Sequence, residues 1–278
     1  MRKVAIVTDS TAFLDKETLQ KYGIEVVPLY INFPDTVIED GSIDNDVFLQ
    51  KLKTSTTLPF TSQPAPGDFV KVFQPLLEEG NEVVAIFISS RMSGTVENAR
   101  AAVKMLETDK ISIVDSLTTS GGLGMLAIEA AKDAEKGKSC EEIVSRVERL
   151  KSNQRLLFIP DTLEYLRKGG RIGGAQAFLG TILQIKPILH FYEGKVEAFD
   201  KVRTMKKAME RIVQELPQST EALYAAVLHA GAPKRAEKMI ELVQEQLPGL
   251  DVQLFELSPV ISTHVGPGVV SLAFMQDV

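Results

Sequence analysis

The sequence predicts an α/β protein built from two packed domains. Short apolar runs recur along the chain and end at Ser, Asp, Pro, Gly or His: Val4–Val7, Val83–Ile88, Ile111–Val114, Leu156–Ile159 and Ala225–Leu228. Apolar runs of this length are typical of strands that are buried on both faces, as in parallel sheets. Segments with helical periodicity separate the runs, and this alternation of strands and helices indicates a parallel sheet covered by helices.

The first half carries four predicted helices. Three of them are expected at Asp68–Leu77, Val96–Leu106 and Leu123–Ala134. The fourth begins after Ser139, because Ser139 and Glu142 have the spacing of a capping box and apolar residues then recur on one helical face.

The second half is expected to fold as a separate domain, residues 156–278, with a mixed sheet and helices. A hairpin is predicted where Ile188–Phe191 and Val196–Phe199 flank a turn. The next elements alternate: helices near Met205–Gln214 and Ala236–Gln246, and strands near Leu223–Leu228 and Val252–Phe255. The first domain, residues 1–155, is expected to hold the mainly parallel sheet.

Composition and charge exclude several classes of protein. With 278 residues, 44% of them hydrophobic and 24% charged, the chain can bury a sizeable core, which excludes disorder and a disulfide-stapled mini-fold. The net charge of −6 and the absence of Trp argue against a nucleic-acid partner. The single cysteine, Cys140, excludes an internal disulfide, and His190, His229 and His264 are too far apart to predict a metal site.

The chain is expected to be cytoplasmic. Met1–Lys3 leads directly into an apolar strand, without the apolar region and cleavage site of a signal peptide. The longest uncharged stretch, Leu257–Gln276, contains two Pro and two Gly residues, which argues against a membrane span.

Hydroxyl side chains gather directly after the predicted strands and in one further loop. They lie in four segments: Thr8–Thr11, Thr61–Pro64, Ser89–Thr95 and Asp115–Gly122. In parallel α/β sheets, ligands bind at the carboxyl ends of the strands, where helix N-termini favour anions. Helix capping alone explains a single such loop. Several loops on one edge of a sheet favour a site for a carboxylate or a phosphate.

Sharper catalytic motifs are missing or misplaced. The chain has no Gly-Lys-Ser/Thr phosphate loop and no Gly-x-Ser-x-Gly elbow. Gly122, Gly124 and Ala127 fit a dinucleotide fingerprint nominally, but they start too far after the predicted strand, so helix packing explains them better. Asp9 could act as a nucleophile in phosphoryl transfer, although Thr11 stands where related phosphatases have a second Asp.

Three other features each allow two interpretations. His264 lies between Pro and Gly pairs before a predicted short apolar helix, and is either a satisfied loop histidine or a contact to the anion. The uncharged segment Ala175–Ile185 is either a core helix or the wall of an apolar pocket. A basic cluster forms either a solvated face or a docking patch for an acidic or phosphate-bearing partner: Arg167, Lys168, Arg171, Lys201 and Arg203.

The sequence closely resembles the DegV family, whose members include the fatty-acid-binding subunits of bacterial fatty acid kinase. Six stretches carry the resemblance, in order over nearly the whole chain: Thr8–Thr11, Thr61–Gly67, Ser89–Thr95, Pro160–Ile172, Lys186–Leu189 and Pro259–Gly268. The resemblance implies a two-domain α/β protein that binds one long-chain fatty acid. The carboxyl group would lie at the domain interface, and the tail would lie in an apolar tunnel of the C-terminal domain.

The same resemblance implies which residues bind the ligand. Thr61 and Ser93 would hold the carboxyl group, and His264 and Arg171 look like the supporting polar set. Further pocket residues are then expected: Ser62, Gly94, Thr95, Phe178, Ile182 and Leu183. Arg171 and Arg203 look like docking points for a kinase.

By this resemblance the chain is a binding subunit with no catalysis, cofactor or nucleotide site of its own. A separate dihydroxyacetone-kinase-like subunit would supply the ATP chemistry and convert the bound acid to an acyl phosphate for phospholipid metabolism. Membrane contact would be transient, without stable insertion. Two alternatives stay open: a stand-alone phosphoryl-transfer enzyme that uses Asp9, and a carrier of another amphiphilic acid.

Overall fold

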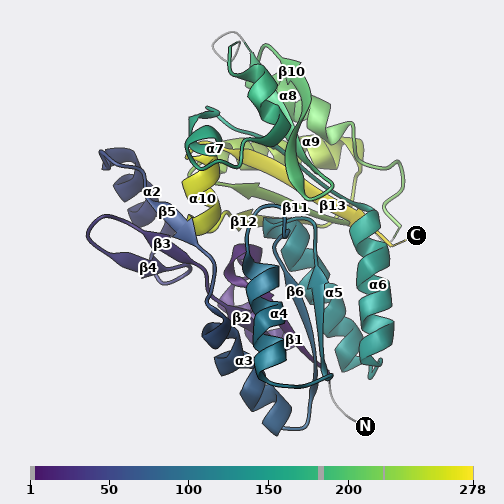
Figure 1. Ribbon diagram of the computed structural model, residues 1–278. Coiled ribbons are helices and arrows are strands. Elements are labelled where there is room, and N and C mark those ends of the chain that lie inside the picture. The colour runs from purple at the N-terminus through teal and green to yellow at the C-terminus, as the bar shows by residue number, and fades with distance from the viewer. Residues whose placement is uncertain (1–3, 181–184, 222, 278) are drawn as a thin grey trace.

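The computed structural model describes residues 4–180, 185–221 and 223–277 (Figure 1). The first half of the chain forms the predicted parallel sheet, with four strands in the order β2-β1-β6-β7. These strands are β1 (Val4–Asp9), β2 (Ile24–Val27), β6 (Glu82–Phe87) and β7 (Ile111–Asp115). Helices cover both faces and bury the apolar runs: α3 (Pro66–Glu78) and α4 (Thr95–Met105) on one, α5 (Ser120–Glu135) and α6 (Cys140–Ser152) on the other.

The second half forms the predicted mixed sheet, with six strands in the order β10-β9-β8-β13-β11-β12. Among its described strand pairs, only β11 and β12 run parallel. The strands are β8 (Gln154–Ile159), β9 (Lys186–Tyr192), β10 (Lys195–Val202), β11 (Leu223–His229), β12 (Val252–Glu256) and β13 (Val270–Gln276). The outer face is covered by two helices, α8 (Met205–Val213) and α9 (Pro233–Gln246).

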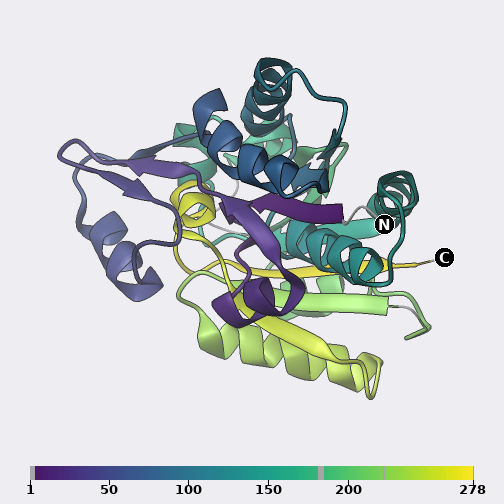
Figure 2. The same ribbon diagram turned by 90° about the horizontal axis from the view of Figure 1, so that it is seen from below.

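Helix α5 packs between the two sheets (Figures 1 and 2). Its small residues allow this close approach on both sides. A Cβ on Gly121 would lie 2.9 Å from Leu228 Cδ1 of β11, and a Cβ on Gly124 would lie 2.9 Å from Leu14 Cδ2. The glycines of the nominal dinucleotide pattern therefore lie inside a helix that is packed between the two halves.

The run Leu156–Ile159 belongs to β8, a strand of the predicted mixed sheet, and both neighbours of β8 run antiparallel to it. One expectation about the second half is wrong. The segment after Gly268 was expected to form a short helix, but it forms β13 in the middle of the sheet. Short apolar runs fit a buried strand and a buried helix equally well, so hydrophobic periodicity could not show which of the two this segment forms.

A third, small sheet has no counterpart in the sequence prediction. Its antiparallel strands have three residues each, too few for a period of two to stand out: β4 (Val37–Glu39), β3 (Tyr30–Asn32) and β5 (Phe60–Ser62). Together with α2 (Asn45–Thr54), these strands form an arm that projects from the side of the molecule (Figure 1). The arm packs against α10 (Pro259–Val265), the short helix that carries His264.

The remaining elements are short: α1 (Lys16–Tyr22), α7 (Glu164–Lys168) and 3-10 helices at Ser10–Ala12 and Gly173–Phe178. The 3-10 helix at Gly173–Phe178 covers the start of Ala175–Ile185, for which a core helix was one of the two interpretations. Residues 181–184 lie outside the described part of the chain. None of the described helices is long and apolar enough to cross a membrane. The domain boundary between residues 155 and 156 falls within β8 and stays a prediction.

Candidate ligand-binding site

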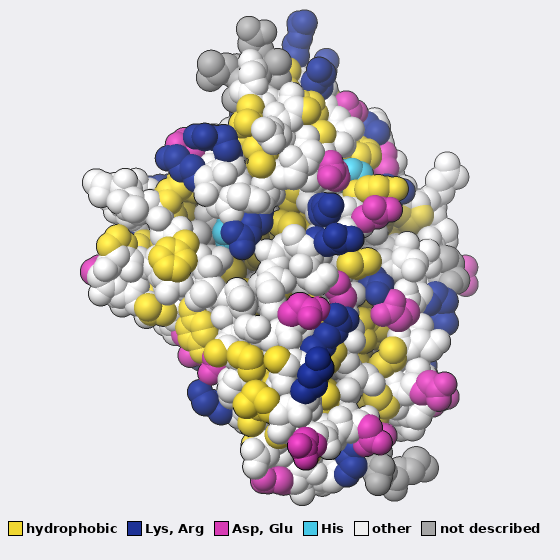
Figure 3. Space-filling model, in the orientation of Figure 1, with side chains coloured by type: hydrophobic (Ala, Val, Ile, Leu, Met, Phe, Trp, Pro, Cys, Tyr) yellow, Lys and Arg dark blue, Asp and Glu magenta, His cyan; other side chains and the backbone are white. Residues whose placement is uncertain are grey.

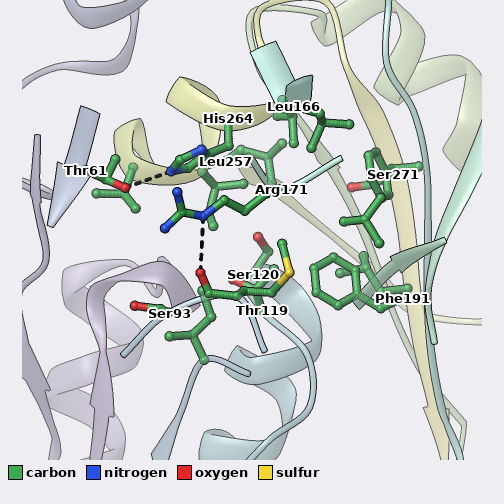
Figure 4. Close-up of a pocket in the computed structure, with 18 of the residues that line it drawn as sticks. Thr61, Ser93, Thr119, Ser120, Leu166, Arg171, Phe191, Leu257, His264 and Ser271 are labelled. Atoms are coloured by element: carbon green, nitrogen blue, oxygen red, sulfur yellow. Dashed lines mark hydrogen bonds between the residues drawn. The ribbon is translucent and has the colours of Figure 1, made fainter. Parts of the chain in front are cut away.

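An apolar cavity lies between the inner face of the second sheet and loops at the carboxyl ends of the first (Figure 4). About 800 Å³ of space lies between the lining atoms, a figure that includes space open to solvent. Strands β8, β9 and β10 and helices α7 and α10 supply much of its wall. Its apolar lining includes Leu156, Phe158, Leu166, Phe191, Val196 and Val260.

Four polar side chains that the sequence singled out line this same cavity, and we call them the head-group end. Each comes from a different segment of the chain. Thr61 lies on β5 of the arm, Ser93 follows β6, Arg171 follows α7, and His264 lies on α10. Residues more than 200 positions apart in the sequence therefore meet at one place.

Hydrogen bonds hold the head-group end together. Thr61 Oγ1 and His264 Nε2 lie 2.7 Å apart, and Ser93 Oγ lies 2.8 Å from Thr95 Oγ1. Arg171 donates from Nε to the Met92 carbonyl at 3.3 Å and from Nη1 to the carbonyl of Gly169 at 2.6 Å. Among the described lining residues, Arg171 is the only Lys or Arg, so the cavity holds one cation without a carboxylate beside it.

His264 is neutral at physiological pH. Burial lowers its pKa to about 4, and the neighbouring Arg171 guanidinium contributes to the shift. Its Nδ1 is buried without a hydrogen-bond partner among the described residues. A Cβ on Gly169 would collide with this nitrogen, which explains why the basic turn after α7 has a glycine there. An uncharged imidazole beside one guanidinium leaves the head-group end with a net positive charge suited to an anion.

Three of the other predicted pocket residues support the head-group end without lining the cavity. Ser62 Oγ accepts a hydrogen bond from Asn32 Nδ2 at 3.0 Å. Gly94 makes room for Gln63, because a Cβ there would lie 2.9 Å from Gln63 Nε2. The hydroxyl of Thr95 contacts that of Ser93.

The remaining predicted residues either do not line the cavity or lie outside the described part of the chain. Phe178 ends the second 3-10 helix and packs against the main apolar core, but it is not among the residues that line the cavity. Ile182 and Leu183 lie outside the described residues. Arg203 is exposed on the turn that follows β10.

Sequence reasoning missed four polar residues that line the cavity: Gln63, Thr119, Ser120 and Ser271. Gln63, Thr119 and Ser120 belong to hydroxyl-rich loops that were already noted, so a signal was present. Ser271 lies on β13, the strand that was taken for a helix, so the pattern gave no reason to place it near a ligand.

Asp9 is bound into the framework and is poorly placed for nucleophilic attack. Its Oδ1 accepts hydrogen bonds from Thr11 N at 3.0 Å and Thr11 Oγ1 at 2.5 Å, and its Oδ2 accepts one from the Ile88 amide at 2.7 Å. It is fully buried, and burial raises its pKa to about 6. No group of His, Cys, Asp or Glu in the described chain could hold a metal ion beside it.

The fold and the site define an α/β protein whose two halves enclose an apolar cavity with polar groups at one end. A search with family models matches residues 3–277 to the DegV family of uncharacterised proteins. The chain therefore belongs to the DegV family. A DegV domain-containing protein of Clostridium acetobutylicum is 38% identical, over 99% of this chain and 98% of that protein.

Solved structures share the whole fold. A DegV family protein from Thermus thermophilus, described as fatty acid binding, is 35% identical with a TM-score of 0.92 and covers 99% of both chains. DegV from Bacillus subtilis, described as a fatty acid binding protein, is 34% identical with a TM-score of 0.90, covering 99% of this chain and all of that one.

Proposed function

We propose that this protein binds one long-chain fatty acid, with the carboxylate at the head-group end and the tail along the apolar wall of the cavity. The observation that carries the proposal is the meeting of Thr61, Ser93, Arg171 and His264 at one end of an otherwise mainly apolar cavity. Two solved relatives are described as binding fatty acids, which supports the choice of ligand.

The tail and the head group contribute differently to binding. Burying about 15 methylenes at about 0.8 kcal/mol each amounts to about 12 kcal/mol before ordering costs. A hydrogen bond to a charged group contributes only about 1.5–3 kcal/mol. The apolar wall therefore sets the affinity, and the polar side chains fix where the carboxylate lies.

The hydrogen bonds of the head-group end suit a carboxylate. When neutral His264 donates from Nε2 to Thr61 Oγ1, the hydroxyl proton of Thr61 is free to donate to the ligand. Ser93 supplies a second hydroxyl and Arg171 the positive charge. The guanidinium also lowers the pKa of a carboxyl group placed beside it, which keeps the bound acid ionised.

We further propose that a separate dihydroxyacetone-kinase-like subunit phosphorylates the bound acid, which makes this chain the binding subunit of a fatty acid kinase in the cytoplasm. Residues 1–155 would supply the hydroxyl-rich loops and residues 156–278 the tail site. In Figure 3, Lys and Arg side chains lie around the middle of one face of the molecule, and hydrophobic side chains show between them. Arg171 and Arg203 are the proposed contacts to the kinase. Exposed Phe60, on the arm beside the head-group end, is suited to a transient membrane contact.

The mass of the purified protein tests the ligand directly. Expressed in a bacterial host, the protein should carry a stoichiometric adduct with the mass of a long-chain fatty acid under native conditions and lose it on denaturation. An adduct of another amphiphilic acid would replace the fatty acid in the proposal. A clean protein mass in both states, with no uptake of added fatty acid and with magnesium-dependent phosphatase activity, would favour chemistry at Asp9 instead.

A further inference from the structure

We infer that the cavity contains a second polar position, formed by the hydroxyls of Thr119 and Ser120, and that it binds a hydroxyl group on the chain of a monohydroxylated long-chain fatty acid. We call these two side chains the inner hydroxyl pair. The inference rests on the proposed function, since it assumes a fatty acid in this cavity, and it adds the class of fatty acid.

The inner hydroxyl pair is buried and faces the cavity. Thr119 and Ser120 are only 4% and 2% exposed, both line the cavity, and neither hydroxyl has a hydrogen-bond partner within the described chain. Figure 4 shows them at the centre of the site, between Thr61 on one side and Phe191 on the other. Because buried hydroxyls are nearly always hydrogen-bonded, two unpaired ones that line the same cavity point to a ligand oxygen.

The start of α5 strengthens this position. Thr119 is the N-cap residue of this 16-residue helix, yet its side chain makes no capping hydrogen bond to the described residues of the helix. Its hydroxyl is therefore available to a ligand. The first amide N–H groups of a helix lack partners within the helix, and the helix dipole favours an oxygen acceptor there. The two hydroxyls and the N-terminus of the helix therefore both favour a ligand group with an acceptor oxygen.

The charge of the cavity selects a neutral oxygen for this position. Arg171, the one Lys or Arg among the described lining residues, belongs to the head-group end and is needed for the carboxylate. A second carboxylate at the inner hydroxyl pair would be buried without a counter-charge. A ligand hydroxyl donates and accepts hydrogen bonds, so it can pair with Thr119 and Ser120 without adding charge.

Competition binding with matched acids tests the inference. The probes are octadecanoic acid and its derivatives with one hydroxyl on carbon three, ten or twelve. The variants are Thr119→Val, which keeps the shape of the side chain, and Ser120→Gly, which suits the left-handed backbone at this residue, where φ is +51°. The control is Thr118→Val, because the Thr118 hydroxyl is also buried and has no hydrogen-bond partner among the described residues, but Thr118 does not line the cavity. Circular dichroism verifies that each variant is folded.

The measured quantity is the affinity for each hydroxy acid divided by the affinity for octadecanoic acid. For the best-placed isomer, this ratio should fall about tenfold in Thr119→Val and in Ser120→Gly, and should stay unchanged in Thr118→Val. A ratio that is the same in the wild type and in both variants overturns the inference while leaving the proposed function intact. If the wild type binds none of these acids, octadecanoic acid included, the proposed function fails and the inference with it.

Discussion

Two buried polar clusters of this protein are built in opposite ways. In the first, Arg146 of α6 lies between carboxylates of α5 and the C-terminal segment. Its Nη2 is 2.9 Å from Glu129 Oε2 and 2.8 Å from Asp277 Oδ2. Its Nη1 is 3.1 Å from Asp133 Oδ2. Lys132 adds a further bond to Glu129 at 2.7 Å. In the second, the head-group end, Arg171 donates within the described residues only to main-chain carbonyls, and His264 Nδ1 has no hydrogen-bond partner there.

The difference distinguishes a part of the framework from the candidate binding site. The Arg146 cluster pairs cations with carboxylates, so it joins α5, α6 and the C-terminal segment and offers little to a ligand. The head-group end instead has a positive charge and hydrogen-bonding groups that are available to a ligand. Such unpaired groups reduce stability and become useful when an anion arrives.

The largest effect is expected from Arg146→Met. Removing the guanidinium leaves Glu129 and Asp133 almost fully buried with a reduced set of cations, so the free energy of unfolding should fall by about 3–5 kcal/mol. Denaturant unfolding measures it. The matched control is Arg149→Met. The Arg149 side chain is half-exposed and, in the part of the chain that the structure describes, forms an ion pair only with Asp277, so its loss should lower the free energy of unfolding by less than about 1 kcal/mol. Equal losses in the two variants would show that the cluster is not the framework described here.

A second prediction concerns pH. The folded pKa of His264, about 4, lies below its ordinary value of 6.5, so between these pH values the unfolded chain binds a proton that the folded chain does not. The contribution of neutral His264 to the free energy of unfolding is therefore complete above pH 6.5, and it is lost as the pH falls through 4. Over this window, the stability of the wild type relative to His264→Gln should fall by about 3 kcal/mol.

Denaturant unfolding of both proteins from pH 7 to pH 4 checks the sign. Buried Asp9 and Asp40 have pKa values raised to about 6 and about 7, so their contributions are lost as the pH rises and oppose that of His264 in the raw curve. The contributions of Asp9 and Asp40 are present in both proteins. They cancel when the stability of His264→Gln is subtracted from that of the wild type at each pH. Two parallel curves would mean that His264 titrates normally and is not buried as neutral imidazole.

The third effect is on function. Ser93→Ala removes one hydroxyl from the head-group end, while Thr61 and Arg171 still hold the carboxylate, so the affinity for hexadecanoic acid should fall by about tenfold. Phosphorylation also depends on how the carboxylate is oriented, so acyl-phosphate formation with the kinase subunit should fall further, by about a hundredfold. Lipid titration and acyl-phosphate assays measure the two. Ser112→Ala, on β7 away from the cavity, is the control, and equal losses of binding and phosphorylation would refute the division of roles.

Those parts of the fold and of the candidate site that depend on local sequence patterns could be predicted. Apolar runs predicted the parallel sheet and a capping box predicted a helix, and the hydroxyl-rich loops that the sequence singled out supply residues that line one cavity. Ser93 could be found this way, since it follows β6 by only a few residues. Thr61 lies in a hydroxyl-rich loop and His264 lies between Pro and Gly pairs, so both were candidates before the resemblance gave them a role. No local pattern predicts that β5 of the arm meets α10.

Other features depend on long-range packing and could not be predicted. The strands of the arm are too short to show a period, and β13 has an apolar run that fits a helix equally well. The same limit applies to the polar residues. Whether the Thr119 hydroxyl caps α5 or faces the cavity depends on its rotamer and on the second sheet, not on the residues beside it.

The smallest effect is expected from Arg203→Ala. Arg203 is exposed, so its loss should leave stability and fatty-acid affinity unchanged. If it contacts the kinase, the concentration of binding subunit needed for half-maximal phosphorylation should rise about three- to fivefold, and the effect should weaken with salt, as for other exposed charges at an interface. Arg149→Ala removes the same charge from α6, in the other half of the molecule, and should have no such effect. A similar rise in both variants would indicate general attraction by net charge, and the basic groups around the head-group end would then have no part in choosing the partner.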